Sequence, residues 1–96
     1  MTSKQRAYLR GLSNSMEVIL HAGKGGISEA MIKQADDALT AREIIKGKVL
    51  ETAPATAREI AEEIAAAVGA EVVHVVGRTF VLFRQRPKDS QIHLPK

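Results

Sequence analysis

The stretch from Val18 to Glu29 carries the residues best suited to chemistry. An apolar run ends there in a glycine-rich loop with one lysine, and a helix start follows. Glycine has no Cβ, so backbone N–H groups beside it can approach a phosphate closely, and a helix start adds unpaired donors and a partial positive charge. A Walker A loop would need Ser or Thr where Gly25 stands, and the dinucleotide fingerprint would need glycine in place of Ser28. The loop is therefore suited to a phosphate but matches neither of these two motifs.

What remains is Gly23-Lys24-Gly25-Gly26, a GxxG loop of the kind that clamps the nucleic-acid backbone in KH-type domains. This sequence alone is weak evidence, because a tight strand-to-helix turn without any ligand uses the same glycines. The rest of the chain must decide between these two interpretations.

Charge is distributed unevenly along the 96 residues, whose formal net charge is +3. Residues 1–24 carry four lysines and arginines against one glutamate, residues 72–96 carry five against one aspartate, and residues 52–71 are acidic. This pattern predicts one basic face, which favours a polyanion, and one acidic face. The chain has no cysteine, which excludes thiol catalysis, and no apolar run long enough for a bilayer. We expect a soluble, cytoplasmic protein without a membrane partner.

Hydrophobic spacing predicts one α/β domain with the order α-β-α-β-α-β-β and a mixed four-stranded sheet packed by helices. The helices are expected over residues 3–12, after an N-cap at Ser28, and between a Thr56–Glu59 capping box and Gly69. Strands are expected over residues 18–21, 43–50, 72–76 and 79–84, the last two joined by a Gly77-Arg78 hairpin turn. Gly47 within the second strand indicates a bulge or a close approach. The domain should cover residues 1–84, followed by an irregular, flexible tail over residues 85–96.

Four separated segments and the tail resemble a known family, the chloroplast RNA splicing and ribosome maturation (CRM) domain. The likeness is greatest to its stand-alone bacterial members of the YhbY type. It implies a fold similar to the C-terminal domain of translation initiation factor three, RNA binding, and association with precursors of the large ribosomal subunit. Gly47 departs from the family pattern, where a bulkier β-former is expected. The matching segments are residues 4–10, 23–26, 44–46 and 76–84, with Ile92-His93-Leu94-Pro95 in the tail.

The same resemblance implies the residues that contact RNA. The backbone-binding loop falls on Gly23, Lys24, Gly25 and Gly26. A single lysine or arginine is more often only a solvated charge, so clustering in space must support each of the basic residues. For Arg84, an ion pair with a helix glutamate is an equal alternative, and Arg6 and Arg10 are expected on the solvent face of their helix. The basic candidates are Lys4, Arg6, Arg10, Lys46, Lys48, Arg78 and Arg84.

Catalysis, a metal and a cofactor are not expected. No serine shows a nucleophile–base arrangement, and His21, His74 and His93 are scattered without a carboxylate motif. The aromatic residues Tyr8, Phe80 and Phe83 are all predicted to lie in the core, so no spare ring is expected for stacking on bases. Recognition should then depend on RNA backbone and shape.

Three functions remain open. The leading hypothesis is a monomeric, non-enzymatic RNA-binding factor in ribosome assembly. A small DNA-compacting protein of similar architecture, which would act as a dimer, is the first alternative. The second is a protein-interaction module, in which the acidic third helix binds a partner and the glycine loop is only a turn.

Overall fold

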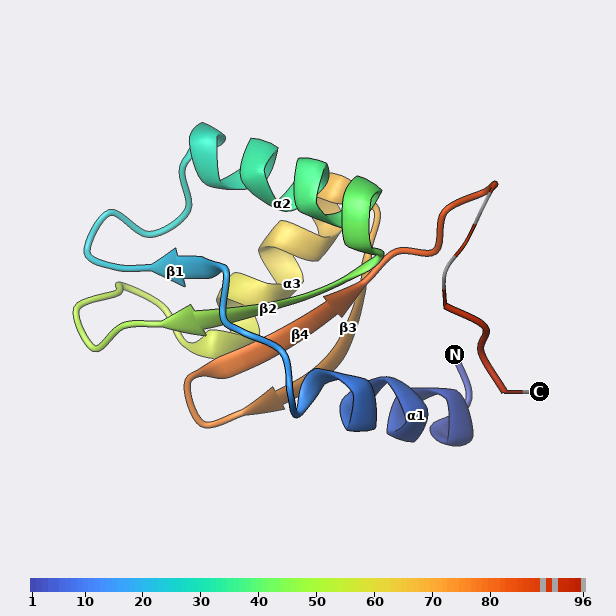
Figure 1. Ribbon diagram of the computed structural model, residues 1–96. Helices are drawn as coiled ribbons and strands as arrows, with labels where there is room; N and C mark the ends of the chain where they lie inside the picture. Colours follow the sequence, from blue (N-terminus) through green and yellow to red (C-terminus); the bar gives the residue numbers. More distant parts are fainter. Residues whose placement is uncertain (89, 91, 96) are drawn as a thin grey trace.

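The predicted order of elements is confirmed in the computed structural model, which describes residues 1–88, 90 and 92–95 (Figure 1). The sheet has the strand order β1-β2-β4-β3, in which β1 runs parallel to β2 and the other neighbours are antiparallel. The fold is therefore the expected mixed four-stranded α/β arrangement. The elements are α1 (Ser3–Ser13), β1 (Leu20–Ala22), α2 (Glu29–Arg42), β2 (Ile44–Val49), α3 (Ala57–Val68), β3 (Glu71–Val76) and β4 (Thr79–Phe83).

Capping residues mark the start of each helix and the end of α3. Thr2 and Thr56 each form a capping box, and the Ser28 hydroxyl accepts a hydrogen bond from the Met31 N–H. Gly69 ends α3 with a φ of +68°. None of the described helices combines the length and apolar character needed to cross a membrane.

The two faces of the sheet are covered differently. Helices α2 and α3 pack on one face around the main core, and α1 packs on part of the opposite face (Figure 1). The second, smaller core lies under α1 and includes Leu9, Val73 and Phe83. Part of the α1 side of the sheet therefore stays open.

Gly47 is explained by a close approach between β2 and β4. It pairs directly with Phe80, and a Cβ on Gly47 would lie 2.3 Å from the Phe80 Cζ atom. The ring occupies the space where any larger residue would put its side chain. The glycine that departs from the family pattern is thus required by the aromatic residue opposite it.

A β-bulge interrupts the pairing of β3 with β4. Val72 pairs with Leu82 and His74 with Val81, which leaves Val73 as the extra residue. The Arg6 guanidinium Nη1 donates to the Val72 carbonyl at 2.6 Å and to the Val73 carbonyl at 3.1 Å. The expectation that Arg6 lies on the solvent face is therefore wrong: it is half-buried and joins α1 to the bulge.

Glu43 lies between α2 and β2 rather than in the strand predicted over residues 43–50. It is fully buried and has a φ of +67°, and its amide donates to the Leu39 carbonyl. Its carboxylate accepts hydrogen bonds from Arg86 N at 3.0 Å, from the Ser90 hydroxyl, and from Ile92 N at 3.2 Å. The Glu43 carboxylate thus joins the irregular tail to the domain, together with Ile92, which is buried in the second core, and the Gln5 side-chain amide, which donates to the Pro95 carbonyl at 3.1 Å. The boundary at residue 84 and the flexibility of the tail stay predictions.

Candidate nucleic-acid interface

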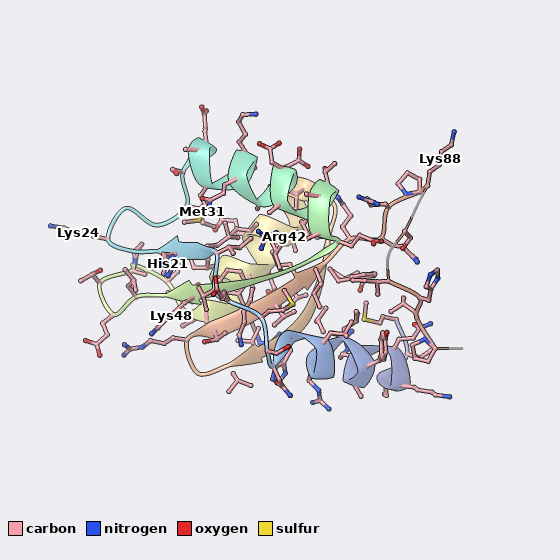
Figure 2. The ribbon with its side chains drawn as sticks, viewed as in Figure 1. His21, Lys24, Met31, Arg42, Lys48 and Lys88 are labelled. Carbon is pink, nitrogen blue, oxygen red and sulfur yellow. The ribbon has the colours of Figure 1, made fainter. Side chains whose placement is uncertain are left out.

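The glycine loop follows β1 as a tight turn. Gly26 N donates to the Gly23 carbonyl at 2.9 Å, so Lys24 and Gly25 occupy the middle of the turn. Ile27 and Ser28 separate this turn from the first residue of α2. Lys24 is exposed and extends outward from the tip of the loop (Figure 2).

The four residues of the loop have different constraints. A Cβ on Gly23 would lie 3.3 Å from Leu50 Cδ1, and one on Gly26, whose φ is +65°, would lie 3.3 Å from Pro54 Cγ. At Gly25 the φ lies outside the left-handed region, and a Cβ would have no heavy atom within 4 Å. The outer glycines therefore serve packing and backbone conformation, while Lys24 and Gly25 face open solvent and can approach a ligand.

Beside the loop, two rows of residues run across the uncovered part of the sheet. In the first row His21 pairs with Lys48, Lys48 with Thr79, and Thr79 with Val76. Figure 2 shows His21 and Lys48 on the neighbouring strands β1 and β2, close to the end that carries Lys24. The second row is Lys46, Val81 and His74.

Helix α1 borders these rows with further positive charge. The Lys46 Nζ donates to the Ser13 carbonyl at 3.2 Å, which holds the ammonium group at the end of α1. Burial, together with the charges of Arg10 and Lys46, holds the pKa of His74 below its usual value. We call the set Arg10, His21, Lys24, Lys46, Lys48 and His74 the open basic face.

Among the basic candidates, Arg78 and Arg84 have carboxylate partners elsewhere. Arg78 Nη1 lies 2.8 Å from Glu51 Oε1, and this hydrogen bond and charge hold the pKa of Glu51 below its usual range. Arg84 Nη1 lies 2.6 Å from Asp36 Oδ1 and 2.8 Å from the Val68 carbonyl, so it joins α2 to the end of α3. The alternative expected for Arg84 was an ion pair with a helix glutamate; Arg84 instead pairs with a helix aspartate, Asp36.

The open basic face itself lacks such neutralising partners. Within residues 1–88, 90 and 92–95, no carboxylate lies within ion-pair distance of Arg10, Lys24, Lys46 or Lys48. Lys4 on α1 is also exposed and unpaired among these residues. Uncompensated like charges on one surface repel each other and favour binding of a polyanion.

The sequence interpretation missed three features of the structure. Tyr8 was predicted to be buried, but 41% of it is exposed because Leu9 faces the core instead; Phe80 and Phe83 are buried as expected. His74 joins the basic residues only because the bulge moves it, and a bulge leaves no clear pattern in the sequence. Arg42, which was not considered, is exposed at the end of α2 (Figure 2).

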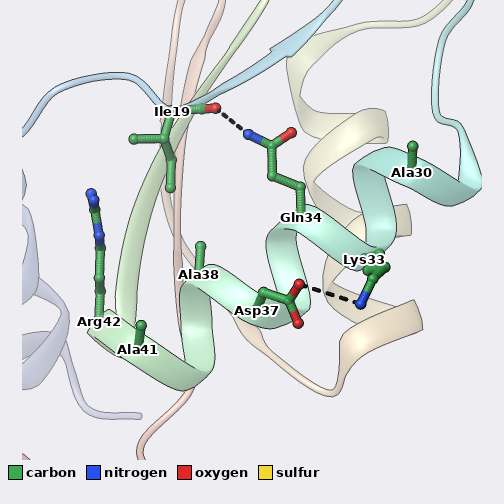
Figure 3. A pocket seen from close by; sticks show the side chains of 8 residues that line it. All are labelled: Ile19, Ala30, Lys33, Gln34, Asp37, Ala38, Ala41 and Arg42. Atoms are coloured by element: carbon green, nitrogen blue, oxygen red, sulfur yellow. Dashed lines mark hydrogen bonds and ion pairs between the residues drawn. The ribbon is translucent and has the colours of Figure 1, made fainter.

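A separate groove of about 580 Å³ lies between α2 and Ile19, just before β1 (Figure 3). Alanines and Ile19 form much of its lining, and the Gln34 amide donates to the Ile19 carbonyl at 3.0 Å. Lys33 and Asp37 in its wall pair with each other at 3.5 Å. The groove therefore carries less uncompensated charge than the open basic face. Among the described residues, no group of three histidine or carboxylate side chains is placed to hold a metal.

Comparison with known proteins gives one consistent set of relatives. The CRS1 / YhbY (CRM) domain matches residues 1–84. The chain is 36% identical to the "Probable RNA-binding protein YqeI" of Bacillus subtilis over 95 residues, which is 99% of each chain. It is 42% identical over 88 residues to the "Probable RNA-binding protein MJ0652" of Methanocaldococcus jannaschii, covering 90% of this chain and 65% of that protein. The solution structure of the hypothetical protein SAV1595 from Staphylococcus aureus is similar, with a TM-score of 0.82, 42% identity and 99% of each chain covered.

Proposed function

Because this chain belongs to the CRS1 / YhbY (CRM) domain family, we propose that it binds RNA through the glycine loop and the open basic face. The observation that carries the proposal is the distribution of ion pairs. Carboxylates neutralise Lys33, Arg58, Arg78 and Arg84, whereas the cations beside the glycine loop have none within reach in the described chain. An unneutralised surface next to an accessible backbone turn suits a phosphate backbone. The names of the relatives favour RNA over DNA.

The proposed partner is ribosomal RNA within a precursor of the large ribosomal subunit, bound in the cytoplasm by a monomer without catalytic activity. The family resemblance supports this partner. The surface supports it too, because its contacts would be mostly to phosphates, which position a protein without reading sequence. A folded RNA surface can then supply the specificity through its shape.

A matched pair of double variants tests the RNA-binding surface. Lys24→Ala with Lys48→Ala removes two exposed cations of the open basic face, and Lys33→Ala with Arg58→Ala removes two exposed cations that are ion-paired on α2 and α3. The first pair should lower the slope of log affinity against log salt by about 1.4–1.8, because each lost phosphate contact contributes about 0.7–0.9. The second pair should leave the slope unchanged. Equal effects of the two pairs would show that the open basic face is not the RNA-binding surface.

The ribosomal partner is tested in lysate of native cells. On a sucrose gradient at low salt the protein should migrate with large-subunit precursors, and RNA crosslinked to it should be ribosomal. Migration with DNA after ribonuclease treatment would favour the DNA-compacting alternative. A defined protein complex that survives nuclease treatment would favour the interaction module.

A further inference from the structure

We propose that the open basic face binds one unpaired nucleotide of its RNA, with the base held in a pocket between the C-terminal end of α1 and the sheet. The inference rests on the proposed function and adds recognition of a base to it. The pocket has a volume of about 240 Å³, less than the about 300–1,000 Å³ of sites for drug-sized ligands. This size suits a single base rather than a run of bases. Its lining includes Asn14, Lys46, His74, Val76, Thr79 and Val81.

The walls of the pocket offer apolar surface for the face of a base and hydrogen-bonding groups for its edge. Val76 is aliphatic and 57% of it is exposed, which leaves apolar surface uncovered at the pocket, whereas Val81 is buried in the second core. The side-chain amide of Asn14 and the Thr79 hydroxyl make no hydrogen bond to another described residue. Amide and hydroxyl groups can both donate and accept, as the edge of a base requires. A flat apolar body with a polar edge fits this surface better than a bare anion.

The charge state of His74 bears on whether the pocket suits a base or a phosphate. Burial and the neighbouring cations Arg10 and Lys46 lower its pKa from 6.5, which favours the neutral imidazole. A neutral imidazole has one donor and one acceptor nitrogen and an aromatic face, which suit a base. The permanent charges of Arg10 and Lys46 lie beside it and can receive the phosphate of the same nucleotide. Lys46 is already held in place by its hydrogen bond to the Ser13 carbonyl.

The bulge is what builds this pocket. In a regular strand successive side chains alternate between faces, so a residue after the buried Val73 would point to the α3 side. The extra residue breaks the alternation, so His74 also lies on the α1 side, while Val75 packs in the main core. Arg6 holds the carbonyls of the bulge. The base pocket thus depends on a local irregularity that α1 stabilises.

The first test follows the imidazole C–H signals of the full chain by NMR during titration with nucleoside monophosphates, ribose 5-phosphate or inorganic phosphate. The proposal expects a saturable shift of the His74 signal with a nucleoside monophosphate and little change with the other two. His93 in the tail serves as the internal control. An equal His74 response to inorganic phosphate would show a phosphate site and overturn the proposal, as would no response to any mononucleotide.

The second test uses two RNA hairpins that differ only by one bulged nucleotide. The protein should bind the bulged hairpin about fivefold or more tightly, as expected for one stacked base. Asn14→Ala, at an exposed position outside the open basic face, should remove this preference but retain binding to the plain hairpin, whereas Lys48→Ala should weaken both. Equal affinity of the unmodified protein for both hairpins would refute the base pocket but not the proposed function. Failure to bind either hairpin would refute the proposed function.

Discussion

Arg6 and Arg10 lie one turn apart on α1, yet the structure predicts opposite consequences for their removal. Arg6 Nη1 donates to two backbone carbonyls of the bulge, at 2.6 and 3.1 Å, and the side chain is half-buried. Hydrogen bonds to charged groups contribute about 1.5–3 kcal/mol each, and one nitrogen supplies both bonds here, so Arg6→Ala should cost about 2 kcal/mol. A change of 1 kcal/mol shifts the Tm of a domain of this size by roughly 4–8 °C. The Tm should therefore fall by roughly 8–16 °C.

Arg10→Ala is the matched control. Its side chain is exposed and makes no hydrogen bond or ion pair within the described chain, so the free energy of unfolding should change by less than about 0.5 kcal/mol. The salt slope of RNA binding should instead fall by about 0.7–0.9. Calorimetric melting and a salt series of RNA titrations measure the two effects. Equal melting temperatures for the two variants would refute the structural role assigned to Arg6.

Four further predictions follow from single sites. Gly25→Asp should weaken RNA binding several-fold at unchanged Tm, because its side chain blocks close approach of the backbone and its carboxylate repels phosphate, and Gly25→Ala, which adds only a methyl group, should weaken binding less. Gly47→Ala should destabilise the domain by about 1–3 kcal/mol in denaturant titrations, with partial rescue by Phe80→Leu. Glu43→Gln should speed hydrogen exchange at the Ile92 amide, because the amide side chain has one acceptor oxygen for three donors. Stability should decline as the pH falls below about 6.5, since the lowered pKa of His74 makes the unfolded chain bind its proton first, and His74→Asn should remove this component.

The features that could be predicted from sequence are those set by neighbouring residues. Capping boxes, the hairpin at Gly77 and the helical spacing of α3 act within a few positions, and the structure agrees with them. Lys46 and Lys48 alternate with buried residues along β2, so the period of two in a strand is enough to place them on one face. The ion pair of Arg84 with Asp36 joins residues 48 positions apart, so it depends on how α2 packs against the end of β4.

The predictions that were wrong concern features that depend on tertiary packing. Tyr8 and Leu9 both lie at helical spacing from Leu12, and only the position of α1 on the sheet decides which one is buried. The burial of Glu43 depends on donors that the chain supplies from residue 86 onward. The role of Arg6 needs the Val72 and Val73 carbonyls at the bulge, which come from β3. Each of these depends on tertiary packing, which local patterns do not encode.

The packing of the glycine loop has a consequence for the rate of binding. Gly23 lies against Leu50 and Gly26 against Pro54, and Val49 N donates to the Arg78 carbonyl of the hairpin at 2.7 Å. The turn is therefore ordered before any ligand arrives, so little conformational entropy is lost when a phosphate binds. Association should then be limited by electrostatically steered diffusion rather than by a search for the correct loop conformation. Pro54→Gly should slow association in stopped-flow measurements although no charge is altered.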